Sequence, residues 1–339
     1  MFSFFLNLLQ RFFMSKNFKI TTFLLIIGII FSIVVNLNIG FLNLHFTDFI
    51  SSTSENSQIA QLRINRILVM LLAGISIPTS GFLLQEYFQN PLAGPSVLGI
   101  TSVASLSVAF YIFFSQDFVL PEFLQNSFLS FTAIGGSLIL MLILLAFSGK
   151  FQDKSFLIIF GFLVSALAGA VVSILQFYAE NQSLKNYILW SFGANNQVSR
   201  SQIWILLIIV LIGLFLTFKT IKPLIGNSLG TAYAQSLGVN IKRLKFFIII
   251  ASSLLSASVT AFLGPILFIG IVVPHFCRML FNPAKLWQQW ILNMLLGILI
   301  MEFFSIISES SQFPLNVITS LFGIPVILMM MLKSKKSQV

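Results

Sequence analysis

Long apolar runs separated by shorter polar segments are the dominant pattern of this chain. A helix needs about 20 apolar residues to cross the roughly 30 Å hydrocarbon layer of a bilayer. Continuous runs of this kind favour helices over membrane β-strands, in which apolar and polar residues alternate. We predict ten spans, at 20–38, 64–88, 96–115, 127–147, 156–178, 201–218, 246–263, 270–283, 288–307 and 315–332.

The segment at 264–283 departs from this pattern, because Gly264-Pro265, Gly270 and Pro274 interrupt it. Such residues favour a broken or re-entrant backbone, which is tolerated at membrane depth when protein buries it or when it lines a wet cavity.

Three polar segments between the spans are long. The segment at 39–62 contains the polar run Ser51-Ser52-Thr53-Ser54, and the aromatic residues at 179–200 favour a short interfacial helix. In the segment at 219–245, glycines divide a run that suits one or two short helices. An ordered loop of that kind favours a docking surface.

The composition supports a membrane protein. Of 339 residues, 57% are hydrophobic, and 19 Lys/Arg with 9 Asp/Glu make only 8% charged, against about 25% in soluble domains. This excludes a soluble enzyme, a disordered tail and a fibrous protein. We therefore predict an all-α polytopic membrane protein of about ten transmembrane helices, with residues 1–339 as one domain. The single cysteine, Cys277, excludes an internal disulfide and a multi-cysteine metal site.

The basic residues predict the orientation. If residue 1 lies in the cytoplasm, most of the 19 Lys and Arg side chains lie on the cytoplasmic side, as the positive-inside rule requires. This explains the net charge of +10 better than a nucleic-acid partner does. We expect both termini in the cytoplasm, 1–19 as a cytoplasmic or interfacial segment, 20–38 as a retained first span, and 333–339 as a cytoplasmic tail.

Several kinds of catalytic chemistry are missing from the sequence. There is no phosphate-binding G-x-x-x-x-G-K-[ST] motif and no H-E-x-x-H motif, and His45 and His275 are far apart. We expect no catalytic residue and no metal site. Two acids, Glu86 and Glu302, fall within predicted spans. Because ion-driven carriers use such acids, an ion-coupled secondary carrier remains an alternative.

Five sequence blocks follow one another from the second span to the last. Their order and spacing resemble the FecCD-type permease subunits of bacterial importers for iron–siderophores, haem and vitamin B12. The blocks are Arg63-Ile64-Asn65-Arg66 with Gly74 and Ser80-Gly81; Asn90-Pro91-Leu92-Ala93-Gly94-Pro95 with Leu98-Gly99; Leu229-Gly230 with Ser236-Leu237-Gly238-Val239; Gly264 through His275 with Arg278; and Pro314 through Thr319 with Gly323-Ile324-Pro325.

The resemblance implies the fold of a type II importer permease in the bacterial inner membrane. It implies a homodimer or pseudo-dimer of ten-helix subunits with the substrate path on its axis, and two separate ATPase subunits that bind ATP and Mg. A periplasmic or lipid-anchored binding protein would deliver the cargo. This chain would bind no cofactor, would contact membrane lipid and would have no nucleic-acid partner.

The resemblance also implies roles for particular residues. Arg63 and Arg66 would receive acidic residues of the binding protein, since guanidinium pairs bidentately with carboxylates; the alternative is that they anchor a helix end. Lys154 and Ser155 would form a cytoplasmic gate, or lie in an ordinary solvated loop. Seven residues would seat the ATPase: Leu229, Gly230, Ala234, Ser236, Leu237, Gly238 and Val239.

The remaining motif residues would have structural roles. They are Asn90, Pro91, Pro95, Gly264, Pro265, Gly270, Pro274, His275, Arg278, Gly323 and Pro325. Within the family, an iron(III)–siderophore cargo is the more frequent, with cobalamin or haem as alternatives. The expected activity is therefore ATP-driven import of an iron chelate by alternating access.

Overall fold

The computed structural model describes residues 18–40, 42–50, 56–114, 131–140, 142–143, 154–193, 198–281, 283 and 285–336. Six of its helices are long and apolar enough to cross a membrane. They are α2 (Phe18–Asn38), α4 (Ser57–Phe88), α7 (Lys154–Tyr178), α9 (Arg200–Ser228), α11 (Ile241–Leu263) and α13 (Leu286–Ser311).

Four shorter apolar helices coincide with the other four predicted spans. They are α5 (Ile100–Phe114), the helix Phe131–Leu140, α12 (Ile269–Phe281) and the apolar part of α14 (Leu315–Lys336). All the regular elements in the described part of the chain are helical. The prediction of an all-α protein with about ten membrane helices is therefore confirmed.

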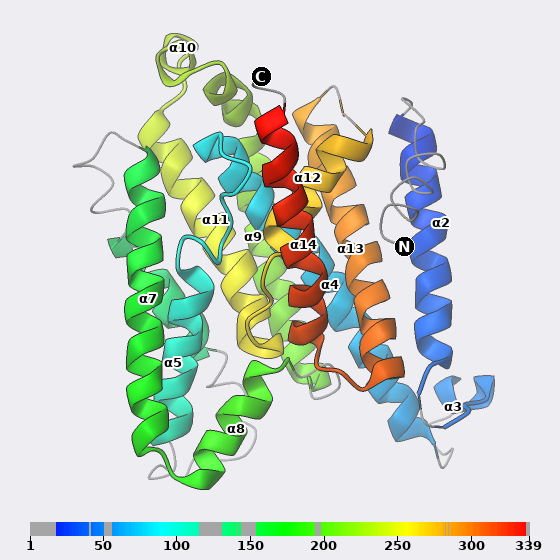
Figure 1. Ribbon diagram of the computed structural model, residues 1–339. Coiled ribbons are helices and arrows are strands. Elements are labelled where there is room, and N and C mark those ends of the chain that lie inside the picture. The colour runs from blue at the N-terminus through cyan, green and yellow to red at the C-terminus, as the bar shows by residue number, and fades with distance from the viewer. Residues whose placement is uncertain are drawn as a thin grey trace.

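The helices run up and down through one bundle (Figure 1). The start of α2, the end of α14 and the short helix α10 (Thr231–Ser236) lie at one end of the bundle. The short helices α3 (Phe46–Ile50) and α8 (Asn181–Ser191) lie at the opposite end. The structure thus contains the short helices that the sequence favoured at 179–200 and 219–245.

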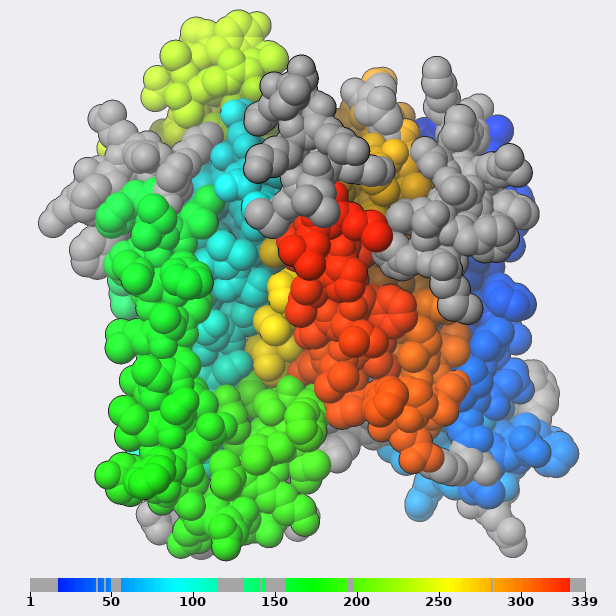
Figure 2. Space-filling view, viewed as in Figure 1, coloured from blue at the N-terminus to red at the C-terminus, as the bar shows by residue number. Residues whose placement is uncertain are grey.

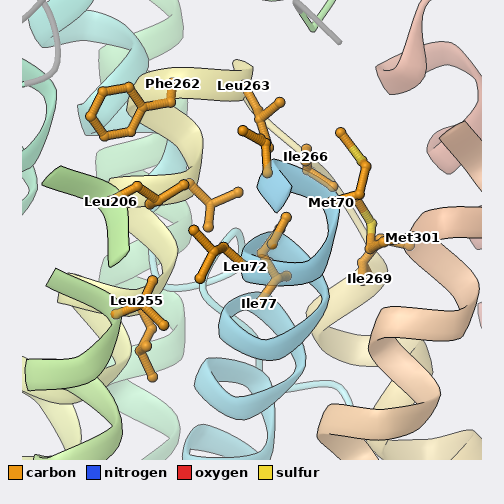
Figure 3. Packing of buried hydrophobic residues seen from close by; sticks show 14 of the residues in the cluster. Met70, Leu72, Ile77, Leu206, Leu255, Phe262, Leu263, Ile266, Ile269 and Met301 are labelled. Atoms are coloured by element: carbon orange, nitrogen blue, oxygen red, sulfur yellow. The ribbon is translucent and has the colours of Figure 1, made fainter. Parts of the chain in front are cut away.

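Helix α4 is the central element of the bundle. Most of its length is buried, and its apolar side chains contribute to both of the large hydrophobic clusters. Figure 3 shows Met70, Leu72 and Ile77 of α4 among apolar side chains of α9, α11, α12 and α13. Helices α2, α9, α11, α12 and α13 all pack on α4, so α4 holds these five helices in place relative to one another.

The outer helices expose broad apolar faces. Helix α7 has little buried surface and lies along one side of the molecule (Figure 2). Its exposed side chains include Phe162, Leu167 and Phe177. Helix α9 exposes Trp204, Ile208 and other large apolar residues at helical spacing. In a soluble protein such faces would aggregate, whereas here they are the surface that lipid or a neighbouring subunit covers.

The largest extensions beyond the predicted spans are in α4 and α9. Helix α4 begins at Ser57 rather than at residue 64, and α9 continues to Ser228 rather than ending at 218. Both extensions are polar, so a prediction based on apolar runs ends too early. A capping box at Ser199, whose side chain accepts from the Gln202 N–H, fixes the start of α9.

The interrupted segment at 264–283 contains a break followed by a helix. Residues 264–268 are non-helical, and α12 begins at Ile269 and continues through Pro274. Gly264 has a positive φ of 73°, and a Cβ there would lie 2.5 Å from the Trp190 carbonyl oxygen. A glycine is therefore required at this close approach to the end of α8.

Candidate functional site

Two arginines of the first motif lie in the N-terminal part of α4, toward the end of the bundle that carries α3, and both are buried. Arg66 Nη1 pairs with Glu309 Oε2 of α13 at 2.8 Å, and its Nη2 donates to the Asn36 carbonyl at 2.7 Å. Arg63 Nη1 donates to the Leu37 carbonyl at 2.8 Å. The two guanidinium groups thus join α4 to the last turn of α2.

The other carbonyls of that turn have local donors. The Val34 carbonyl accepts from Asn38 Nδ2 at 2.7 Å, and the Val35 carbonyl accepts from the Ile39 N–H at 3.2 Å. The last turn of a helix leaves four carbonyls without intrahelical donors and carries a partial negative charge. The arginines satisfy two of these carbonyls, and their positive charge suits this position.

These contacts occupy N–H donors of Arg63 and Arg66 that a carboxylate of another protein would need. A partner's carboxylate would have to displace contacts that each guanidinium already makes. Among the described residues at this end, the exposed cations are Lys185 on α8 and Arg200 at the start of α9. The predicted docking role of Arg63 and Arg66 stays a prediction, and the helix-anchoring alternative matches the observed contacts.

A buried polar contact beside these arginines was not foreseen in the sequence. Glu302 of α13 is fully buried, and its Oε2 accepts from Asn36 Nδ2 at 2.6 Å. Asn36 Nδ2 also lies 3.3 Å from Ser305 Oγ. No local signal could have paired residues so far apart in the chain. Glu302, one of the two acids considered for ion coupling, therefore has a hydrogen-bond partner on α2.

A second junction at the same end of the bundle as α3 involves the end of α8. Trp190 Nε1 donates to the Ala261 carbonyl of α11 at 3.2 Å, and the Asn316 N–H of α14 donates to the Phe192 carbonyl at 3.3 Å. Burial raises the pKa of Tyr187 on α8 to about 12, so its phenol stays neutral. The end of α8 is thus hydrogen-bonded to both α11 and α14.

At the opposite end of the bundle, the segment at 219–245 that was predicted to seat the ATPase forms an ordered projection. Helix α10 stands between α9 and α11, with Gly230 (φ 110°) and Gly238 (φ 80°) at its two ends. These left-handed conformations favour glycine, and a Cβ at either position would meet nothing within 4 Å. The glycines therefore serve the turns and not close packing.

The loop is anchored on one side and exposed on the other. Ala234 is fully buried, and a Cβ on Gly226 of α9 would lie 3.5 Å from Ala234 Cβ and 3.5 Å from Val239 Cγ2. Leu229, Tyr233 and Leu237 remain 65%, 50% and 61% exposed, and Ser236 is also exposed. Figure 2 shows α10 projecting beyond the body of the protein. Exposed leucines on a rigid projection are suited to a protein partner.

Arg278 of the fourth motif block belongs to a polar cluster at the same end of the bundle as α10. Arg278 Nη1 of α12 pairs with Glu86 Oε1 of α4 at 2.7 Å, and Gln289 Nε2 of α13 donates to the same oxygen at 3.2 Å. Gln85 Nε2 donates to the Pro91 carbonyl at 2.8 Å and to the Ile271 carbonyl at 3.0 Å. This cluster joins α4, α12 and α13.

The turn after α4 has its own support. Asn90 Oδ1 accepts from the Leu92 N–H at 2.9 Å, a side-chain turn that Asn commonly makes. Pro95 lies against Gly270, where a Cβ would be 3.1 Å from Pro95 Cδ. The structural role of Asn90, Pro91 and Pro95 stays a prediction, and these contacts are the ones that such a role would use.

The other structural motif residues lie in α12, in the turn before it, and in α14. His275 is half-buried on α12, next to Pro274, and Pro265 lies in the non-helical turn. A Cβ on Gly323 would lie 2.5 Å from Phe268 Cβ, so α14 approaches that turn closely, and Pro325 lies within α14.

The predicted gate residues are only partly placed. Helix α7 begins at Lys154, but the side chains of Lys154 and Ser155, and residues 151–153 before them, lie outside the described residues. Residues 1–17 of the predicted N-terminal segment also lie outside the described residues. The same holds for residues 337–339 of the predicted tail. Within the described residues, no group of three or more His, Cys, Asp or Glu side chains could hold a metal ion.

Comparison with known proteins identifies the family. The profile of the FecCD transport family matches residues 24–333. The hemin transport system permease protein HmuU of Yersinia pestis is 30% identical over 327 residues, covering 93% of this chain and 96% of that protein. The vitamin B12 import system permease protein BtuC of Citrobacter koseri is 27% identical over 279 residues, covering 81% and 83%.

Solved structures share the fold. A structure described as a metal-chelate type ABC transporter in an inward-facing conformation superposes with a TM-score of 0.80 at 24% identity, covering 94% of this chain and 100% of that one. PsaBC from Streptococcus pneumoniae in complex with Fab gives a TM-score of 0.60 at 16% identity, covering 84% and 95%. The architecture is that of an ABC permease, and the chain belongs to the FecCD transport family.

Proposed function

We propose that this chain is the permease subunit of an ATP-driven importer that carries an iron(III)–siderophore-type chelate across the inner membrane by alternating access. The match of residues 24–333 to the FecCD transport family is the observation that carries this proposal. A permease of this family is a transport subunit and not an enzyme. This chain would supply the path, while ATP and Mg bind to separate ATPase subunits.

The inner end of the structure supports an ATPase partner. Helix α10 and its flanking glycines hold Leu229, Tyr233 and Leu237 outward on a short, anchored projection. A rigid projection transmits a push into α9 and α11 without being remodelled itself. Two ATPase subunits, one for each copy of this chain in a homodimer, would seat on these projections.

The remaining parts of the assembly follow from the same proposal. A binding protein would dock on the end that carries α3 and α8, which would then face the periplasm. Helix α10 and both chain termini would lie in the cytoplasm, in agreement with the positive-inside distribution. Lys154 and Ser155 at the start of α7 would then lie at the cytoplasmic end of the path.

The alternative cargoes are haem and cobalamin. They are favoured by the relatives, of which one is named for hemin transport and others for vitamin B12 import. All three cargoes are large metal chelates, so the same mechanism applies to each.

The ion-coupled carrier has less support. Such a carrier needs carboxylates that load and release an ion. Glu86 pairs with Arg278, and Glu302 accepts from Asn36. Both acids therefore hold bundle contacts, which favours structural roles for them.

Uptake by cells tests the cargo. Cells with and without the gene would be given a radioiron-loaded hydroxamate siderophore, haemin or cyanocobalamin, with the other two as competitors. Loss of siderophore-iron uptake alone is the expected result. Loss of haemin or cobalamin uptake alone would replace the cargo but keep the permease, and normal uptake of all three would contradict the proposal.

A further inference from the structure

Two crossings of α4 with its neighbours share an unusual geometry. In the first, Pro78 of α4 has no N–H, so the Gly74 carbonyl four residues earlier lacks its usual helical donor. A Cβ on Gly297 of α13 would lie 2.2 Å from that same Gly74 oxygen and 2.6 Å from Pro78 Cγ. The oxygen left without its helical donor therefore faces the backbone of a neighbouring glycine.

The second crossing repeats this arrangement with the roles exchanged. Pro274 of α12 leaves the Gly270 carbonyl without its usual helical donor. A Cβ on Gly81 of α4 would lie 1.6 Å from the Gly270 oxygen. In both crossings, a proline in one helix and a glycine in the next meet at one carbonyl.

Such contacts tolerate displacement. A Cα–H···O contact is weaker than an N–H···O hydrogen bond, so moving it costs less. Glycines also provide no side chain that would interlock the two helices, and a proline marks a point at which a helix bends. Ordinary crossings, where side chains interdigitate, resist sliding more strongly. We call these two crossings the proline–glycine joints.

Unpaired polar groups lie beside the first joint. Ser76 is on α4 between Gly74 and Pro78, and Asn293 is one helical turn before Gly297 on α13. Both residues are fully buried, and among the described residues neither Ser76 Oγ nor either amide atom of Asn293 has a hydrogen-bond partner. Buried groups without partners cost free energy, so the observed arrangement is not the best one for these side chains.

We propose that α13 shifts along α4 at the Gly74–Pro78–Gly297 joint when the transporter changes its access, and that Asn293 gains hydrogen-bond partners in the second arrangement. Helix α12 follows at the Gly81–Gly270 joint. The proposal rests on the proposed transport function, because only a transporter needs two arrangements. Helix α4 is bonded to α11, since Ser80 Oγ donates to the Ser252 carbonyl at 2.8 Å. The shift of α13 would therefore exchange its own contacts with α4, which are Glu309 with Arg66, Gln289 with Glu86 and Trp290 with Thr79.

The test measures the movement itself, so that it does not depend on the cargo. Spin labels would be placed at Gln89 on α4 and Lys285 before α13, both exposed, in one subunit of the full transporter with its ATPase subunits. Cys277, the only native cysteine, would be replaced by serine. We expect the label distance to change by a few ångströms between the nucleotide-free and the ATP–vanadate states.

Variants then test the joint. Pro78→Ala supplies an N–H that can donate to the Gly74 carbonyl, and it adds no bulk. We therefore expect the ATP-driven change in the spin-label distance to be at least threefold smaller in a folded protein. Gly297→Ala collides with backbone and is expected to displace α13 at rest. Gly28→Ala is the matched control, because a Cβ there meets only Leu299 side-chain atoms at 3.5 Å, and it should behave as the wild type.

Asn293→Leu tests the role of the unpaired amide. Removing a group that is unpaired only in the observed arrangement should raise the thermal midpoint of that state and reduce the ATP-driven distance change. An unchanged distance change in both Pro78→Ala and Asn293→Leu would overturn the proposal.

The wild type separates this proposal from the proposed function. If ATP hydrolysis drives transport without any change in the spin-label distance, the proposed shift of α13 along α4 is wrong, and the proposed transport function stands. A chain that supports no ATP-driven transport would overturn both.

Discussion

Arg66 connects three helices through one side chain. It pairs with Glu309 of α13 at 2.8 Å and donates to the Asn36 carbonyl of α2 at 2.7 Å, while its own side chain is 1% exposed. Removing one member of a buried pair leaves the other without compensation, which is more costly than losing a surface pair. The residue thus determines how α2 is attached at its outer end.

The first prediction concerns this attachment. Arg66→Leu should destabilise the protein by about 3 kcal/mol, because Glu309 and the end of α2 lose their partner. The thermal midpoint of the purified protein in detergent measures this effect. Arg200→Leu is the control, since Arg200 is exposed at the start of α9. Equal midpoints for the two variants would contradict the buried role of Arg66.

At the residue scale, the sequence predicts position better than partnership. It places Arg63 and Arg66 near the start of the second span, and both lie in the N-terminal part of α4. The sequence cannot pair Arg66 with Glu309 or Asn36 with Glu302, because these contacts join different helices. They depend on how α2 packs against α4 and α13, which local spacing does not encode.

The helices show the same division between predictable and unpredictable features. The ten spans follow from apolar runs, because the bilayer requires them. Their ends are less predictable where a helix continues beyond the apolar run, as α9 does through Lys219, Lys222 and Pro223 to Ser228. A helix that leaves the hydrocarbon layer no longer needs apolar residues.

The α10 loop allows a clean test of coupling at the scale of one element. Gly238→Ala strains a residue whose φ is 80°, yet its Cβ meets nothing within 4 Å. We expect a local cost of about 1 kcal/mol, a thermal midpoint near that of the wild type, and at least a twofold loss of cargo moved per ATP hydrolysed.

Gly226→Ala is the matched control, because Gly226 is helical and a Cβ there would make ordinary contacts at 3.5 Å. An unchanged transport-to-ATP ratio in Gly238→Ala would show that the shape of this turn does not matter for coupling.

For the whole molecule, the open question on the outer face is which cations meet a partner. Arg63→Glu with Arg66→Glu should weaken binding of the binding protein and also lower the thermal midpoint, since both side chains are buried. Lys185→Glu with Arg200→Glu changes exposed charges, so it should weaken binding without loss of stability.

The measurement is binding-protein affinity for the transporter in nanodiscs, with the thermal midpoint measured in parallel. If affinity is unchanged in both double variants, the outer face does not recognise its partner through these charges. Loss of affinity in the first variant alone would assign docking to the motif arginines, as the family resemblance implies.

The central claim is that ATP, and not an ion gradient, drives transport through this fold. The most direct measurement is uptake of a radioiron-loaded hydroxamate siderophore, haemin or cyanocobalamin into proteoliposomes that contain the chain with its ATPase subunits and binding protein. We expect one of these compounds to accumulate only with ATP and Mg at the ATPase side, with an uncoupler having no effect. Accumulation without ATP that an uncoupler abolishes, and that Glu86→Gln or Glu302→Gln alters, would contradict the claim.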